Sequence, residues 1–115
     1  MVVQERIDPG LASDPEFGSK VQRASLQLRE LVAESNLDVT ADWKLVRTKD
    51  GQRKIQLELA DPPTVSEVLL GPEELDTAGE LRRALGWFWG GFALARAKRL
   101  IRESRELAVN SEVGA

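Results

Sequence analysis

One stretch, residues 77–107, most constrains what this chain can fold into. It begins with Thr77-x-x-Glu80, in which each side chain can satisfy a free backbone N–H of a first helical turn, and it contains no proline. Its middle, residues 84–95, has no charged side chain and holds two of the three tryptophans and two of the three phenylalanines. This pattern predicts one long helix that is apolar around most of its circumference.

The length of this helix conflicts with the size of the domain. Residues 77–107 would span about 46 Å at about 1.5 Å per residue, whereas a compact chain of this size has a radius of gyration of about 13 Å. Two outcomes are open: the helix breaks at Gly90-Gly91, where each glycine costs about 1 kcal/mol relative to alanine, or its end from about Lys98 projects beyond the core.

The apolar surface of the helix also exceeds what one sheet can cover. Gly86-x-x-x-Gly90 and Gly91-x-x-x-Ala95 place small residues on successive turns, which allows another backbone to approach closely. We expect a homodimer contact there, with a wholly intramolecular core as the alternative. The predicted interface residues are Trp87, Trp89, Gly90, Gly91 and Leu94.

The segments before this helix predict a second helix and a β-hairpin. A helix capped by Ser13 or Asp14 carries apolar residues from Phe17 to Leu31 at spacings of three and four. Apolar and polar residues then alternate over residues 39–48 and 54–59. A three-residue loop ending at Gly51 pairs the apolar positions on one face, so Leu45 lies opposite Ile55, Trp43 opposite Leu57 and Ala41 opposite Leu59.

The fold class follows from this order of elements. Residues 64–70 predict a third strand, and Pro72 to Leu75 one helical turn before the long helix. We expect an α+β domain of order α-β-β-(β)-α, with both helices on one face of a small antiparallel sheet. Residues 1–14 are predicted to be a mobile leader, residues 15–108 a single domain, and residues 109–115 a mobile tail.

Composition excludes several kinds of chemistry. The chain has neither cysteine nor histidine, so disulfides, thiolate or imidazole metal ligands and Ser-His-Asp or Cys-His nucleophiles are excluded. The carboxylates of Asp42 and Glu58 fall on the predicted solvent face, and the acidic residues near Glu73 suit a helix start. We therefore expect no enzyme activity, no metal and no cofactor. The absence of a signal peptide and of an apolar run long enough to span a membrane favours a cytoplasmic protein.

Two basic clusters support an alternative function in nucleic-acid binding. The net charge is −3, but residues 82–115 carry seven basic and three acidic side chains. The strand-strand-strand-helix order resembles that of double-stranded RNA-binding domains, although the chain lacks that family's Gly-Pro-x-His loop and Lys-Lys-x-Ala-Lys helix start, so no residue role carries over. A small acidic dimeric chaperone is a further alternative. The candidate polyanion contacts are Lys49, Arg53, Lys54, Arg96, Arg99 and Arg102.

Overall fold

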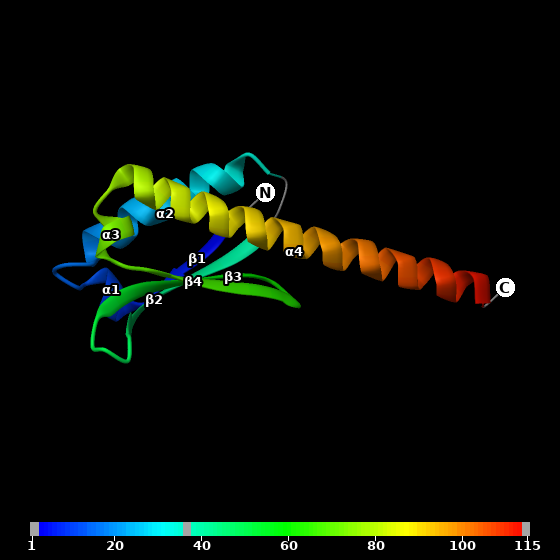
Figure 1. The fold of residues 1–115 in the computed structure, drawn as a ribbon, viewed down its shortest axis with the longest axis horizontal. Helices are drawn as coiled ribbons and strands as arrows, with labels where there is room; N and C mark the ends of the chain where they lie inside the picture. The colour runs from blue at the N-terminus through cyan, green and yellow to red at the C-terminus, as the bar shows by residue number, and fades with distance from the viewer. Residues whose placement is uncertain (1–2, 36–37, 114–115) are drawn as a thin grey trace.

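The computed structural model describes residues 3–35 and 38–113, with the side chains of residues 4–35 and 38–107. It shows the predicted α+β class: one four-stranded sheet packed by helices (Figure 1). The strands are β1 (Val3–Ile7), β2 (Val39–Arg47), β3 (Arg53–Asp61) and β4 (Thr64–Leu70), and they lie in the order β1-β2-β3-β4. The helices are α1 (Pro9–Ala12), α2 (Gly18–Ala33), α3 (Pro72–Leu75) and α4 (Ala78–Val113).

The hairpin of β2 and β3 has the predicted register. Ala41 pairs with Leu59, Trp43 with Leu57 and Leu45 with Ile55, and all but the half-buried Leu45 are buried. Gly51 has a φ of 88°, the left-handed conformation that favours glycine, and the Gly51 N–H donates to the Thr48 carbonyl at 3.0 Å. The predicted third strand is also present, because β4 pairs antiparallel with β3.

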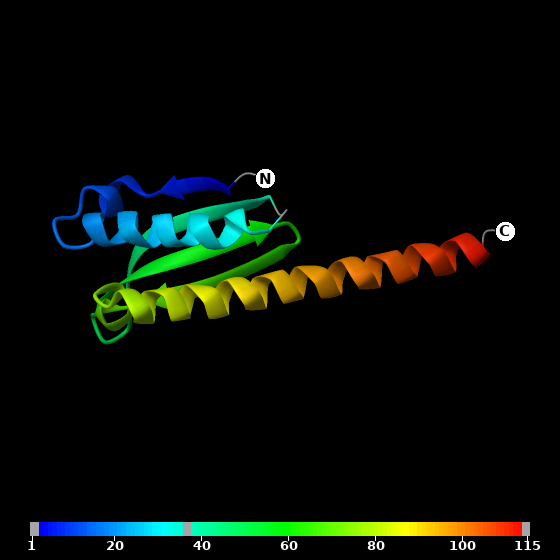
Figure 2. The ribbon, with the colours of Figure 1, turned by 90° about the horizontal axis from the view of Figure 1, so that it is seen from above.

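The core lies on one face of the sheet. The two long helices, α2 and α4, both cover that face (Figures 1 and 2), as the alternation of apolar residues predicts. The opposite face carries polar side chains such as Lys44, Gln56 and Glu58, together with the exposed apolar Val65 and Leu69 of β4. The buried residues that fill the space between the layers include Leu28 and Val32 of α2, Trp43, Ile55, Leu57 and Leu59 of the sheet, and Leu81, Leu85 and Phe92 of α4.

The start of the chain is more ordered than the predicted leader. Residues 3–7 form β1, which pairs parallel with β2, so the sheet as a whole is mixed. The Glu5 side chain points into the core face and is 6% exposed. It accepts hydrogen bonds from Ser25 Oγ (2.6 Å) and Trp43 Nε1 (2.9 Å) and pairs with Arg29. These contacts hold the strand to two other elements. The first two residues of the predicted leader lie outside the described residues.

Helix α4 is continuous through Gly90-Gly91, so the projecting arrangement is the one observed. The described residues extend over 62 × 31 × 23 Å with a radius of gyration of 17.0 Å, larger than the about 13 Å of a compact chain. Figures 1 and 2 show the second half of α4 extending past the sheet. The helix continues to Val113, through most of the predicted tail, and residues 114–115 lie outside the described residues.

Candidate functional site

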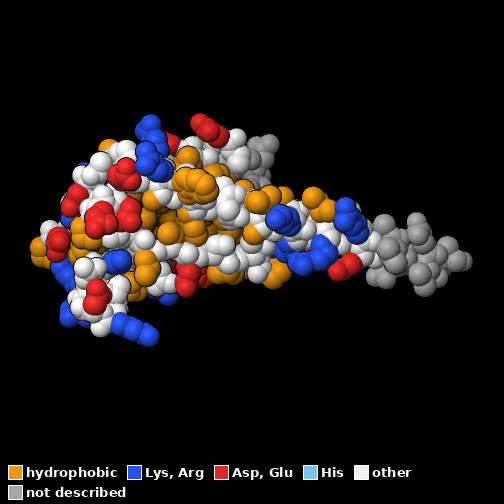
Figure 3. Space-filling model, viewed as in Figure 1, with side chains coloured by type: hydrophobic (Ala, Val, Ile, Leu, Met, Phe, Trp, Pro, Cys, Tyr) orange, Lys and Arg blue, Asp and Glu red, His pale blue; other side chains and the backbone are white. Residues whose placement is uncertain are grey.

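The outer face of α4 is the surface opposite its core-facing stripe. Leu81, Leu85 and Phe92 face the sheet and are 2% exposed or less. Trp87 is 80% exposed, Leu94 57% and Ile101 54%. We define the outer face by its apolar and small residues: Gly86, Trp87, Gly90, Gly91, Leu94, Ala97 and Ile101. Figure 3 shows apolar side chains on the surface over the middle of the helix. Exposed apolar patches are a feature of interaction surfaces, which makes the outer face the candidate site.

Trp89 lies apart from the other four predicted interface residues. Two residues along a helix correspond to a rotation of about 200°, so Trp87 and Trp89 face different directions. Trp89 is partly buried against the core, with its ring centroid 5.9 Å from that of Phe92. The structure therefore brings Trp87, Gly90, Gly91 and Leu94 together on one surface and places Trp89 against the domain's own core.

A shallow groove runs beside Trp87. It has a volume of about 460 Å³ and is lined by Gly86, Trp87, Gly90, Gly91 and Leu94. A Cβ atom added at Gly86, Gly90 or Gly91 would meet no neighbouring atom within 4 Å. The floor of the groove is therefore bare helix backbone, with room for a bulky side chain from another molecule.

The outer face also has the spacing of a helix-pairing seam. Large apolar residues recur every seven positions at Trp87, Leu94 and Ile101, and small residues recur at Gly90 and Ala97 between them. A seven-residue repeat keeps one seam of a helix turned toward a partner helix. Small residues within the seam let the two backbones approach closely.

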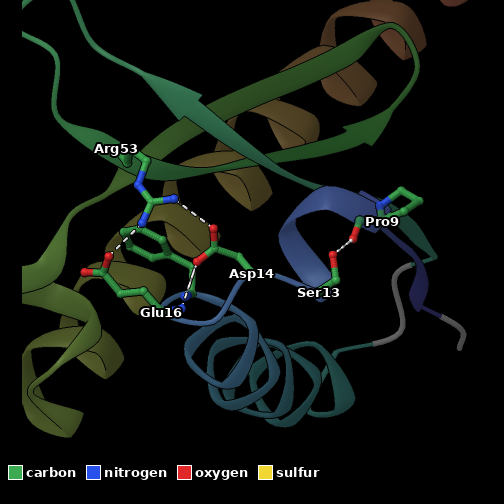
Figure 4. Close-up of polar contacts among 6 residues, drawn as sticks. Pro9, Ser13, Asp14, Glu16 and Arg53 are labelled. Carbon is green, nitrogen blue, oxygen red and sulfur yellow. Dashed lines mark hydrogen bonds and ion pairs between the residues drawn. The ribbon is translucent and has the colours of Figure 1, made fainter.

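Three of the six predicted polyanion contacts are committed to partners within the molecule. The Arg53 guanidinium binds Asp14 at 2.8 Å and Glu16 at 2.7 Å, and these hydrogen bonds, that to Glu16 first, raise the Arg53 pKa (Figure 4). Arg96 pairs with Asp61. Arg99, of which 11% of the side chain is exposed, donates to the Asp61 carbonyl and to Thr64 Oγ1, both at 2.7 Å. The last two arginines fasten α4 to the β3–β4 turn.

The remaining three cations do not form one surface. Lys49 and Arg102 are exposed and Lys54 is half-buried beside Gly71. The β2–β3 turn, which carries the first cluster, lies at the same end of the molecule as α3, whereas α4 carries the second cluster away from that end (Figures 1 and 2). The two predicted clusters are therefore not brought together.

The residue that the sequence interpretation missed is Glu5. Its partners, Ser25, Arg29 and Trp43, lie between 20 and 38 positions away. The one available signal is that Val3, Glu5 and Ile7 alternate as a strand does, with the glutamate on the same side as two apolar residues. This cluster fixes β1 in place, and all three of its contacts are with the domain's own residues.

Two features are absent from the described residues. Among residues 3–35 and 38–113, no group of three or more acidic side chains is arranged to hold a metal ion. In the same residues, no helix combines the length and hydropathy needed to cross a bilayer. Comparisons with known protein families, with curated proteins and with solved structures find no match to this chain.

Proposed function

We propose that this chain is a small non-enzymatic assembly module that forms a homodimer through the outer face of α4. The observation that carries the proposal is a tryptophan 80% exposed beside an open glycine-floored groove. A bulky apolar side chain and an empty site for one lie next to each other on a single surface. Such a surface is complementary to a second copy of itself, which is what a two-fold dimer requires.

The free energy gained by burying Trp87 is large enough to support this proposal. A tryptophan side chain buries about 150–250 Å², so covering the exposed part of Trp87 is worth about 3–5 kcal/mol at about 25 cal/mol per Å². A two-fold dimer buries two copies of this residue. Together they offset much of the about 4–15 kcal/mol that association costs in lost freedom. Leu94 and Ile101 add to the same surface.

The test is the mass in solution of the Trp87→Asp variant. Light scattering coupled to size exclusion should give the parent chain as a dimer of 2 × 12.7 = 25.4 kDa at high concentration, and Trp87→Asp as a 12.7 kDa monomer. The folded monomer should persist, because Trp87 makes little contact with the core. Trp89→Asp is a poorer test, since that ring packs on Phe92.

The control is Leu26→Asp. Leu26 is 58% exposed on α2, outside the outer face of α4, so the same apolar-to-acidic change should leave the dimer mass unchanged. A parent chain that stays monomeric up to high concentration, or a Trp87→Asp variant that remains dimeric, would overturn the proposal.

A further inference from the structure

We infer that the two α4 helices pair antiparallel, with Trp87 of each copy seated in the glycine groove of the other. This inference rests on the proposed function and specifies its geometry. The two-fold axis crosses α4 between Trp87 and Gly91, near the level of residue 89. Each residue of α4 then lies opposite a partner residue at about the same distance beyond the axis, so residues 98–100 of one copy lie opposite residues 78–80 of the other. The basic residues that follow approach the partner's α3.

The positions of the bulky and small residues distinguish the two orientations. Trp87 and Gly91 are one helical turn, about 6 Å, apart along α4. An antiparallel two-fold axis between them brings each tryptophan over the partner's Gly90-Gly91, where a Cβ would meet nothing within 4 Å. Parallel pairing in register would instead set tryptophan against tryptophan and leave the glycine level unfilled. The antiparallel orientation packs the helices closely both at the level of Trp87 and at the level of Gly90-Gly91.

The charges along α4 favour the same orientation. Acidic side chains gather around α3 and the start of α4, at Glu73, Glu74, Asp76 and Glu80, and exposed basic ones at Lys98, Arg102 and Arg105 (Figure 3). Antiparallel pairing sets the basic segment opposite the partner's acidic segment. Parallel pairing would set the basic segment beside its own copy, and like charges at that distance repel.

The acidic segment has room for a further cation. Asp76 pairs with Lys20 at 2.7 Å and Glu80 with Arg83 at 3.5 Å, but the Asp76 and Glu80 side chains remain 53% and 52% exposed. Their carboxylates can accept additional hydrogen bonds from an arginine or lysine of the partner, because an ionised carboxylate has about four acceptor positions. The projecting basic part of α4 thus meets a complementary surface at the far end of the second molecule.

Disulfide crosslinking tests the orientation, because the parent chain has no cysteine. In the inferred register, Lys98 of one copy lies opposite Glu80 of the other, and Ala97 lies one residue, about 1.5 Å along the helix, from that level. Under oxidising conditions the double variant Glu80→Cys/Ala97→Cys should give a covalent dimer on non-reducing gels, and each single variant should not. Positions 80 and 97 are about 26 Å apart along one helix, so a bond within one chain is excluded.

The outcomes separate this inference from the proposed function. If light scattering shows a dimer and the Ala97→Cys variant alone crosslinks, the helices pair parallel. If light scattering shows a dimer and no variant crosslinks, the helices pair in another register. Either result overturns the inferred orientation but leaves the proposed homodimer intact. A parent chain that is monomeric at all concentrations removes both.

A charge exchange supplies a second readout. Lys98→Glu should raise the Kd of the dimer about threefold to tenfold, and adding Glu80→Lys should restore it. Lys44→Glu, on the sheet face opposite the core, is the matched control and should change the Kd little. A Lys98→Glu variant that dimerises as the parent does, or one not rescued by Glu80→Lys, would contradict the charge pairing.

Discussion

Asp14 shows how one side chain joins segments far apart in the sequence. Its Oδ1 accepts the backbone N–H groups of Phe17 and Glu16, both at 2.9 Å, and its Oδ2 pairs with Arg53 of β3 (Figure 4). The hydrogen bond from the Phe17 N–H is the largest cause of a lowered Asp14 pKa, against a smaller opposing effect of desolvation, and the Glu16 N–H and Arg53 lower it further. The turn before α2 and a long-range ion pair therefore depend on one carboxylate.

We expect Asp14→Asn to lower the melting temperature at neutral pH, because the amide keeps the shape of the side chain but loses the charge. A lowered folded-state pKa means that the ionised form stabilises the fold above the unfolded pKa of about 4, and that this contribution is lost as the pH falls through the folded pKa. The difference in melting temperature between parent and variant should therefore shrink below about pH 4. A difference that stays constant from pH 7 to pH 3 would contradict the assigned role.

Asp14 and Glu5 show which contacts the sequence could predict and which it could not. The predicted helix cap at Ser13 or Asp14 was wrong, because α2 begins at Gly18 with Phe17 at its N-cap and no side-chain cap bond. The Asp14 side chain instead binds N–H groups two and three residues away, in the turn before the helix. The role of Glu5 was not predictable, because its partners belong to α2 and β2 and come together only in the folded chain. Without those partners, the short segment around Glu5 has the sequence of a mobile leader.

At the scale of elements, local sequence patterns predicted the pairing of β2 with β3 but did not predict the edge strand β1. The β2–β3 register followed from alternation and a glycine turn, both of which are local. β1 is a five-residue parallel edge strand whose neighbour in the sheet begins over 30 residues later, so no short-range signal marks it. The continuity of α4 through Gly90-Gly91 also depends on tertiary contacts, because packing of Leu85 and Phe92 on either side holds the helix.

Substitution of Gly90 or Gly91 is predicted to have opposite effects on the stability of the monomer and on dimerisation. In the monomer, Gly90→Ala and Gly91→Ala should each stabilise the helix by about 1 kcal/mol, because neither Cβ meets a neighbouring atom. In the dimer, the same methyl groups should occupy the groove and raise the Kd. Thermal unfolding at low concentration and light scattering across a dilution series measure the two effects.

Gly79→Ala is the matched control for these variants. Gly79 lies in the first turn of α4, outside the groove, and a Cβ there also meets nothing within 4 Å. It should raise the Kd less than alanine at position 90 or 91 does, because position 79 lies outside the groove although the partner's helix end approaches it. If alanine at positions 90 and 91 leaves dimerisation intact, the groove does not receive a partner side chain.

At the scale of the whole molecule, the projecting end of α4 is the feature that a monomer does not explain. Arg99 anchors the helix to the β3–β4 turn, and each residue from Leu100 to Leu107 is exposed. A helical segment of this length is marginal in water without a packed face. In the inferred dimer the segment extends past the start of the partner's α4 and lies beside the partner's α3. Its stability should therefore depend on protein concentration, unlike that of the core.

Amide hydrogen exchange measures this dependence directly. Amides beyond Arg99 should exchange rapidly at concentrations below the dimer Kd and become protected above it, whereas amides of β3, which lies between two other strands, should be protected at both. Trp87→Asp should keep the helix end unprotected at every concentration. If the helix end of the parent chain is equally protected at both concentrations, its order comes from within one molecule; if it is unprotected at both, the partner does not cover it. Protection that rises with concentration would show that the projecting end of α4, which its own domain does not cover, is covered by the second copy.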